Sequence, residues 1–143
     1  FVHLLVATGN TSITISSQTQ SVSYQNGRWR GSLAFDVSQM YKITVGNDCE
    51  ISLVGPAIVP AEHPVTIRYG FNWFAFPFAT TMSLDDAFDG FAVQGDMVKS
   101  QSGTATFIRN HWIGAVDLLP GKGYIYQSAN EDDRTLVFPE SAD

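Results

Sequence analysis

Apolar and polar residues alternate over short runs along most of this chain, which is the two-residue period of half-buried β-strands. Aromatic and β-branched residues, which strands favour, are plentiful in these runs. Asn26-Gly27 between two runs predicts a type I′ hairpin turn, because both residues tolerate a positive φ. Arg109-Asn110-His111 is the weaker equivalent. Strands are expected at residues 13–15, 21–24, 40–45, 51–54, 71–77, 104–107, 123–127 and 135–138. Val98 marks one more strand, and Trp29 and Trp112 each begin another.

One short helix is predicted where the alternation breaks. Ser83 is a good N-cap, and Asp86 three residues later fits a capping box. Gly90 would end the helical turn. The residues expected to face inward are Leu84, Ala87 and Phe88. Residues 2–6 hold the equivalent place near the start of the chain, and we expect them to form a second such helix.

Two copies of one unit follow each other in the chain, 83 positions apart. Trp29-x-Gly31 matches Trp112-x-Gly114 at this offset. Further matches are Ser17-Gln18 with Ser100-Gln101, Tyr24 with Phe107, Tyr41 with Tyr124, and Leu53-Val54-x-Pro56 with Leu136-Val137-x-Pro139. We therefore expect an all-β fold, mainly antiparallel, with one short helix per repeat and two small units of barrel or sandwich type.

The two copies are unequal. Residues 1–56 are interpreted as the first copy, 57–65 as a proline-rich linker, and 66–143 as the second copy. At the common offset Phe1 corresponds to Leu84, so the first copy lacks a counterpart of the second copy's opening strand. It is interpreted as N-terminally incomplete, in a fragment of a larger protein. We expect its open sheet edge to be covered by the other copy, by the linker, or by a neighbouring chain, as in a strand-mediated dimer.

Composition excludes several classes of function. Apolar residues make up 44 % of the 143 residues and charged residues only 15 %, which excludes a disordered tail. No run of about 18 apolar residues occurs, so we expect no membrane insertion. The net charge of −6 disfavours nucleic acid and anionic lipid as partners. A single cysteine, Cys49, excludes an internal disulfide framework.

Several motifs of the second copy are similar to a known repeat. Gly70-Phe-Asn-Trp-Phe-Ala-Phe-Pro77 resembles the G-W-N-W-I-S-F-P opening of a tandem β-repeat common in secreted and surface proteins of Bacteroidetes-type bacteria. Later parts of the pattern fit Gly95-Asp96, Lys99-Ser-Gln101, Trp112-Ile-Gly114 and Leu119-Pro-Gly-Lys-Gly-Tyr124. The first copy departs from the pattern at Ser38-Gln-Met-Tyr41. The resemblance implies an extracytoplasmic β-rich module, often appended to other domains, with no catalytic residues to carry over.

Four aromatic residues are candidate ligand contacts: Trp29, Trp112, Tyr24 and Tyr124. Flat aromatic rings on a sheet face can stack on sugar rings or peptide side chains. The alternative, which we favour, is that they anchor the core of each unit. Trp73 lies in a strand that is apolar on both faces, and this strand is expected to be buried on both sides.

The remaining polar clusters favour structural interpretations. Asp85, Asp86, Asp89 and Asp96 lie close in sequence, but a glycosidase needs two carboxyl groups held across a cleft. The acidic turn at residues 130–133 lacks the spaced oxygen ligands of a Ca²⁺ loop, and whether it binds Ca²⁺ stays open. The three histidines and the cysteine show no spacing typical of a metal site or a nucleophile. We therefore predict no catalytic residues, no metal and no cofactor.

Two functions remain from different classes. The first is a non-catalytic extracellular module for surface display, adhesion or substrate attachment, with a glycan or a surface protein as its partner. The alternative is a purely structural spacer that positions neighbouring domains of the parent chain. An enzyme would require distant segments to bring carboxylates or a Ser–His pair together, which the spacing does not indicate.

Overall fold

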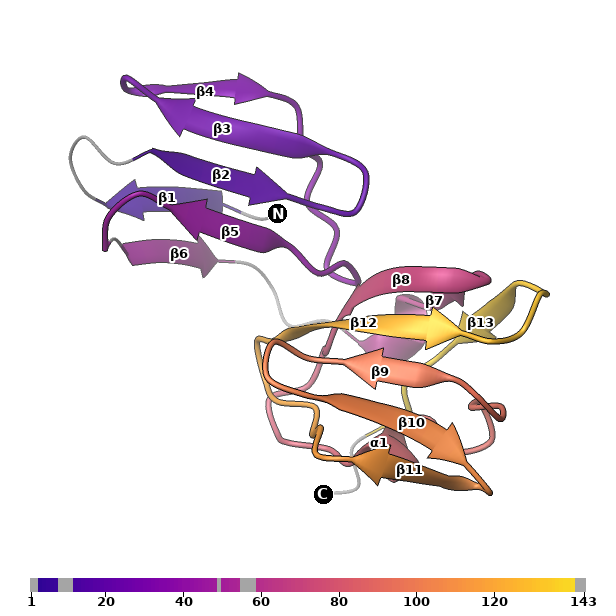
Figure 1. Ribbon diagram of the computed structural model, residues 1–143. Helices are drawn as coiled ribbons and strands as arrows, with labels where there is room; N and C mark the ends of the chain where they lie inside the picture. Colours follow the sequence, from indigo (N-terminus) through magenta and orange to yellow (C-terminus); the bar gives the residue numbers. More distant parts are fainter. Residues whose placement is uncertain (1–2, 8–11, 49, 55–58, 141–143) are drawn as a thin grey trace. The chain divides into compact units, whose positions relative to one another are not determined.

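The computed structural model describes residues 3–7, 12–48, 50–54 and 59–140. The chain divides into two compact units, the first comprising Phe1–Asp36 and Tyr41–Ala57, the second Val37–Met40 and Ile58–Asp143. In both units the strands pair antiparallel (Figure 1). The predicted all-β class is therefore confirmed.

The first unit contains a four-stranded sheet in the order β4-β3-β2-β5. Its strands are β2 (Ile13–Ser16), β3 (Ser21–Gln25), β4 (Arg28–Gly31) and β5 (Lys42–Val45). The turn between β3 and β4 has positive φ at Asn26 and Gly27, as the sequence predicts for a type I′ hairpin. A separate pair is formed by β1 (His3–Ala7) and β6 (Glu50–Val54).

The helix expected at residues 2–6 does not form, and this prediction was wrong. Residues 3–7 are strand β1, which pairs Leu4 with Leu53 and Val6 with Ile51. In the second unit the equivalent of β6 is β13 (Arg134–Leu136), which pairs with β7 (Val65–Ile67). Pairing with β1 instead satisfies the backbone groups of β6, which would otherwise lack partners. The described residues of the first unit therefore contain no α-helix.

The second unit contains a five-stranded sheet in the order β11-β10-β9-β12-β8. Its strands are β8 (Gly70–Ala75), β9 (Met97–Lys99), β10 (Thr104–Ile108), β11 (His111–Gly114) and β12 (Gly123–Ser128). A second sheet pairs β7 (Val65–Ile67) with β13 (Arg134–Leu136). Within the proline-rich segment, Pro60–Glu62 forms a short 3₁₀ helix, η1.

The strand registers of the two larger sheets coincide at the 83-residue offset. Tyr24 pairs with Trp29 across β3 and β4, and Phe107 pairs with Trp112 across β10 and β11. One row of the first sheet consists of Gly31, Val22, Ile15 and Ile43, and its counterpart consists of Gly114, Ala105, Val98 and Tyr126. Strand β5 thus holds the place of β12, and β8 has no counterpart in the four-stranded sheet.

Helix α1 (Leu84–Ala87) begins as the sequence predicts. The Oγ of Ser83 accepts the N–H of Asp86 at 3.1 Å, which caps the helix, and donates to the carboxylate of Asp86 at 2.7 Å. Leu84, Ala87 and Phe88 are buried, as expected for the inward face. Gly90 follows in the left-handed region with φ +67°.

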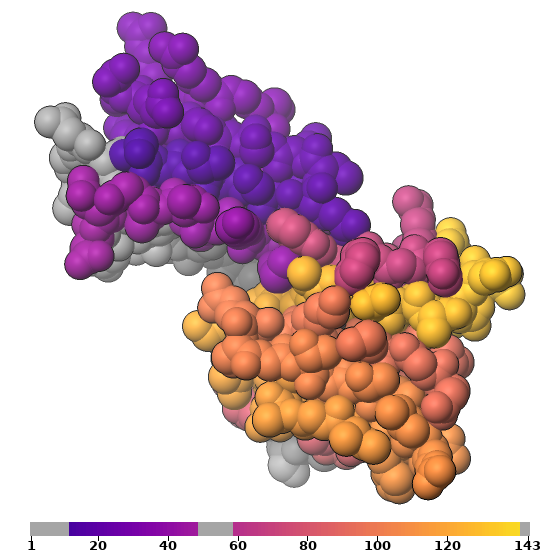
Figure 2. All heavy atoms as spheres, in the orientation of Figure 1, coloured from indigo at the N-terminus to yellow at the C-terminus, as the bar shows by residue number. Residues whose placement is uncertain are grey.

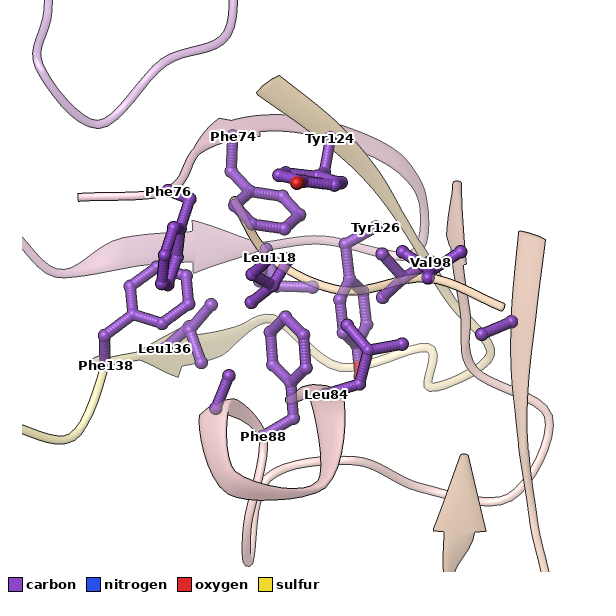
Figure 3. Packing of buried hydrophobic residues seen from close by; sticks show 14 residues of the cluster. Phe74, Phe76, Leu84, Phe88, Val98, Leu118, Tyr124, Tyr126, Leu136 and Phe138 are labelled. Atoms are coloured by element: carbon purple, nitrogen blue, oxygen red, sulfur yellow. The ribbon is translucent and has the colours of Figure 1, made fainter. Parts of the chain in front are cut away.

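One hydrophobic core fills the space between the five-stranded sheet, the β7–β13 pair and α1 (Figure 3). Phe88 stands at its centre, with its ring centroid 5.1 Å from Tyr126, 5.7 Å from Trp112 and 6.0 Å from Phe74. The ring of Tyr124 stacks on Phe74 at 5.7 Å. A single helical turn therefore closes an aromatic core.

Strand β8 is not buried on both sides, so the prediction that it is was wrong. Asn72 and Phe74 face the core and are buried, whereas Phe71 on the other face is 54 % exposed and Trp73 is partly exposed. The reason is that the core lies against a single face of the sheet. An apolar pattern on both faces does not reveal whether a second layer is present.

Candidate functional site

The two tryptophans at the hairpins differ in their surroundings. Trp112 packs against Phe107 at 5.3 Å and is also covered by Phe88, the residue that follows α1, so it belongs to the margin of the core. Trp29 packs against Tyr24 at 5.1 Å and remains 38 % exposed. The first unit has no described helix to cover it. Equivalent positions therefore give one core residue and one surface residue.

Tyr41 and Tyr124 hold the same turn in the two units. The hydroxyl of Tyr124 accepts the N–H of Leu119 at 2.7 Å and donates to the carbonyl of Asp117 at 2.9 Å. The hydroxyl of Tyr41 accepts the N–H of Asp36 at 2.6 Å and reaches the carbonyl of Ala34 at 3.3 Å. Tyr124 is buried. Its position is that of a structural residue that fastens a loop.

Serine and glycine motif residues also repeat their contacts. The N–H of Ser17 donates to the carbonyl of Gln20 at 2.8 Å, and that of Ser100 donates to Gly103 at 2.9 Å. Their side chains accept N–H groups inside the same turns. Gly31 and Gly114 both have positive φ, and a Cβ on either would lie within 2.8 Å of a carbonyl oxygen on the neighbouring strand. These shared residues are explained by backbone geometry.

A buried polar cluster, which was not predicted from the sequence, lies beneath the five-stranded sheet. The carboxylate of Asp96 is fully buried and pairs with Nη2 of Arg134 at 3.0 Å. It also accepts the hydroxyl of Tyr126 and the N–H groups of Val93 at 3.0 Å and Ala129 at 2.8 Å. Burial, followed by the hydrogen bond to Asp96, raises the pKa of Tyr126 well above its ordinary value.

Arg134 completes this cluster from strand β13. Its Nη1 donates to the carbonyl of Phe91 at 2.7 Å, and its guanidinium lies 4.5 Å from the centre of the Phe91 ring. The signals in the sequence were the arginine at the start of the closing strand and Asp96 of the Gly95-Asp96 motif. With every Asp96 oxygen occupied by protein donors, the arrangement is that of a structural ion pair.

Asp85, Asp86 and Asp133 have partners outside this cluster. Asp85 accepts the N–H of Trp112 at 3.2 Å, and Asp86 belongs to the helix cap. In the acidic turn, Asn130 accepts the N–H of Asp132 at 2.9 Å, and Asp133 lies 3.7 Å from Arg68. Over the part of the chain that is described, no three His, Cys, Asp or Glu residues gather in an arrangement suited to a metal ion. Cys49 lies outside the described residues.

The side of the five-stranded sheet that faces away from the core carries exposed apolar and aromatic side chains. We call this side the outer face. One row across it consists of Phe71, Gln127, Met97, Thr106 and Ile113, and the next of Trp73, Ile125, Lys99 and Thr104. The ammonium of Lys99 lies 4.9 Å from the centre of the Phe71 ring. Because α1 and the β7–β13 pair lie behind the sheet in Figure 1, the outer face is turned to the viewer there and in Figure 2.

Comparisons with known proteins give no match. No family model matches the sequence, and no curated protein or solved structure resembles the chain significantly. Among the described residues, no helix has the length and apolar character needed to cross a bilayer.

Proposed function

We propose that this chain is a non-catalytic attachment module of an extracellular or cell-surface protein, and that it binds a glycan on the outer face. The observation that carries the proposal is the 54 % exposure of Phe71 on an open sheet face, beside the ammonium of Lys99. Exposed apolar patches rimmed by polar groups are typical of interaction sites. Gln127 and Thr106 in the same row offer amide and hydroxyl groups to a polar ligand.

The aromatic residues singled out from the sequence support this proposal unequally. Trp112 and Tyr124 contribute to the core, and a ligand would have to displace packed rings to reach them. Trp29 and Tyr24 form an aromatic pair in which Trp29 is exposed. This aromatic pair is a second candidate surface for glycan binding, and the experiment compares it with the outer face.

Affinity gel electrophoresis in soluble polysaccharides, after a glycan array has selected them, tests the proposal. Phe71→Ala should weaken retention about five- to tenfold, since stacking on an exposed ring contributes roughly 1–1.5 kcal/mol. Trp29→Ala is the matched control and should retain the binding of the parent chain. Loss with Trp29→Ala alone would move the site to the first unit, and a blank array would overturn the proposal.

The second candidate function is a spacer that positions neighbouring domains. The observation that favours it is that Tyr41, Tyr124, Gly31 and Gly114 perform the same structural tasks in both units. A spacer would leave the glycan array blank while Phe71→Ala and Trp29→Ala changed stability alone. The same two variants therefore distinguish attachment from spacing.

A further inference from the structure

The four-stranded sheet of the first unit has one apolar side and one polar side. Ile13 and Ile15 of β2 are buried at 1 % exposure, so they face the interior of the unit. The strand residues on the opposite side carry hydroxyl, amide or cationic groups, and we call this side the polar face. Its rows across the sheet are Arg30, Ser23, Thr14 and Thr44, then Ser21, Ser16 and Lys42, and finally Gln25 with Arg28.

The charges on the polar face are all positive. Arg28, Arg30 and Lys42 are exposed there, and none of the described strand residues that share the face with them is Asp or Glu. In the part of the chain that the structure describes, no carboxylate forms an ion pair with any of the three. The whole chain has a net charge of −6, so this face differs in sign from the protein that carries it. A local excess of positive charge concentrates anionic ligands.

The equivalent positions of the second unit show that the sheet does not require these charges. Arg30 corresponds to Ile113 at the 83-residue offset. Lys42 corresponds in the same way to Ile125. Both isoleucines lie on the outer face, since α1 and the β7–β13 pair pack against the other side of that sheet. One sheet therefore presents an apolar face and the other a cationic face, which suits two different ligands.

The spacing of the cations suits a polymer that lies across the strands. Arg28 and Arg30 are two positions apart on β4, which separates them by about 7 Å. Lys42 lies on β5, at the far side of the sheet from β4, about 14 Å away at the usual strand spacing. The hydroxyls of Ser23 and Thr14 lie between, 3.4 Å from each other. The face therefore offers separated positive charges with hydrogen-bonding groups among them.

We propose that the polar face binds an acidic polysaccharide through the carboxylates of its sugars. The guanidinium fork of an arginine pairs with a carboxylate through two parallel hydrogen bonds. Arg28 and Arg30 hold neighbouring carboxylates of the polymer, and the hydroxyls of Ser23 and Thr14 exchange hydrogen bonds with its sugar hydroxyls. This site is independent of the glycan site on the outer face, because it lies in the other unit and selects a charged ligand.

Other anionic partners match the polar face less well. A protein partner would bury an apolar centre, and a single-stranded nucleic acid would stack its bases on aromatic rings, but the strand residues of this face supply neither. Anionic bilayers attract clusters of about four to eight cations, more than this face carries. The net charge of −6 opposes densely charged polymers such as duplex nucleic acid. A polymer with a carboxylate on each sugar and hydroxyls between them fits both the charge and the hydroxyl rows.

Polygalacturonate and its methyl-esterified form test the proposal on the full chain. The two polymers share one sugar backbone, and esterification removes the carboxylate charge. In affinity gel electrophoresis, polygalacturonate should bind at least about tenfold more tightly than the ester. Arg30→Gln should weaken its binding about fivefold, because one exposed charge pair is lost. Arg109→Gln is the matched control, since it removes the same charge from an exposed hairpin of the second unit and should leave binding unchanged.

Amide NMR locates the site without any variant. Polygalacturonate should shift the signals of Arg30 and Lys42 and leave the signal of Phe71 in place. Binding should also weaken as salt is added, because exposed charge pairs are screened.

Four results would overturn the proposal. They are equal binding of the esterified polymer, equal weakening by Arg109→Gln, binding of dextran sulfate at least as tight as that of polygalacturonate, and NMR shifts confined to Phe71 and its neighbours. The third would indicate general attraction of anions. The fourth would assign the polymer to the outer face. Neutral polysaccharides and Phe71→Ala test that outer face separately, so either site can fail without the other.

Discussion

Arg134 and Asp96 form a buried ion pair, with 3.0 Å between Nη2 and the carboxylate. The Asp96 side chain is shielded completely from solvent, and the Arg134 side chain is 15 % exposed. Taking both charges out of water is costly, so each depends on the other for compensation. The pair joins the start of β9 to β13 and holds the two sheets of the second unit around their core.

Replacing Arg134 should therefore destabilise the second unit strongly. We expect Arg134→Met to lower the free energy of unfolding of the second unit by about 3–5 kcal/mol, because Asp96 is left buried and unpaired. Arg68→Met is the control, since the pair formed by Arg68 and Asp133 is largely exposed, and it should cost less than about 1 kcal/mol. Urea denaturation measures both variants. Similar small losses in the two would show that the buried pair is dispensable.

Alkaline pH should destabilise the second unit through Tyr126. Its pKa is raised in the folded state by burial and by Asp96, so the neutral phenol is favoured there. This stability is fully present below the unfolded pKa of about 10 and is lost as pH rises above it, at about 1.4 kcal/mol per pH unit. Denaturation between pH 8 and 11 should show this decline, and Tyr126→Phe should remove most of it. An unchanged decline in Tyr126→Phe would contradict the assignment.

Gly114 should not accept a side chain. A Cβ there would lie 2.3 Å from the carbonyl oxygen of Thr104, on a backbone with φ +140°. We expect Gly114→Ala to cost more than about 3 kcal/mol or to prevent folding of the unit. Gly121 also has a positive φ, but a Cβ there would meet open space. Gly121→Ala should therefore lower the free energy of unfolding by only about 1–2 kcal/mol. Circular dichroism during denaturation compares the two, and equal costs would refute the steric explanation.

The equivalent tryptophans should differ in their contribution to stability. Trp112→Ala removes a ring that packs on Phe88 and Phe107, and we expect a loss of about 3–5 kcal/mol. Trp29→Ala removes a ring that is partly exposed beside Tyr24, and should cost less than about 2 kcal/mol. Amide NMR signals followed through a urea series would separate the two units. A larger loss for Trp29→Ala would show that the first unit depends on this ring.

Local signals predicted the parts of the fold that local chemistry determines. Asn26-Gly27 specifies a hairpin because both residues adopt positive φ, and Arg109 and Asn110 do the same in the second unit. Ser83 and Asp86 specify the start of α1 through their own hydrogen bonds. Each of these features depends on residues within four positions of one another.

Features that depend on distant partners were missed. Residues 2–6 were assigned a helix from their place in the repeat, yet β6 needed a strand partner and residues 3–7 provide it. Phe71 was expected to be buried because its strand is apolar on both faces, although only one face meets the core. Asp96 and Arg134 lie 38 positions apart, and their pairing exists only once two sheets have formed.

The place that Asp96, Tyr126 and Ser128 occupy in the second unit is held by Ile13, Ile43 and Val45 in the first. The free-energy cost of removing ions from water falls as the temperature rises. The hydrophobic association of aliphatic side chains weakens as the temperature falls. At these equivalent positions alone, heating should therefore favour the buried ion pair of the second unit, and cooling should weaken the aliphatic contacts of the first.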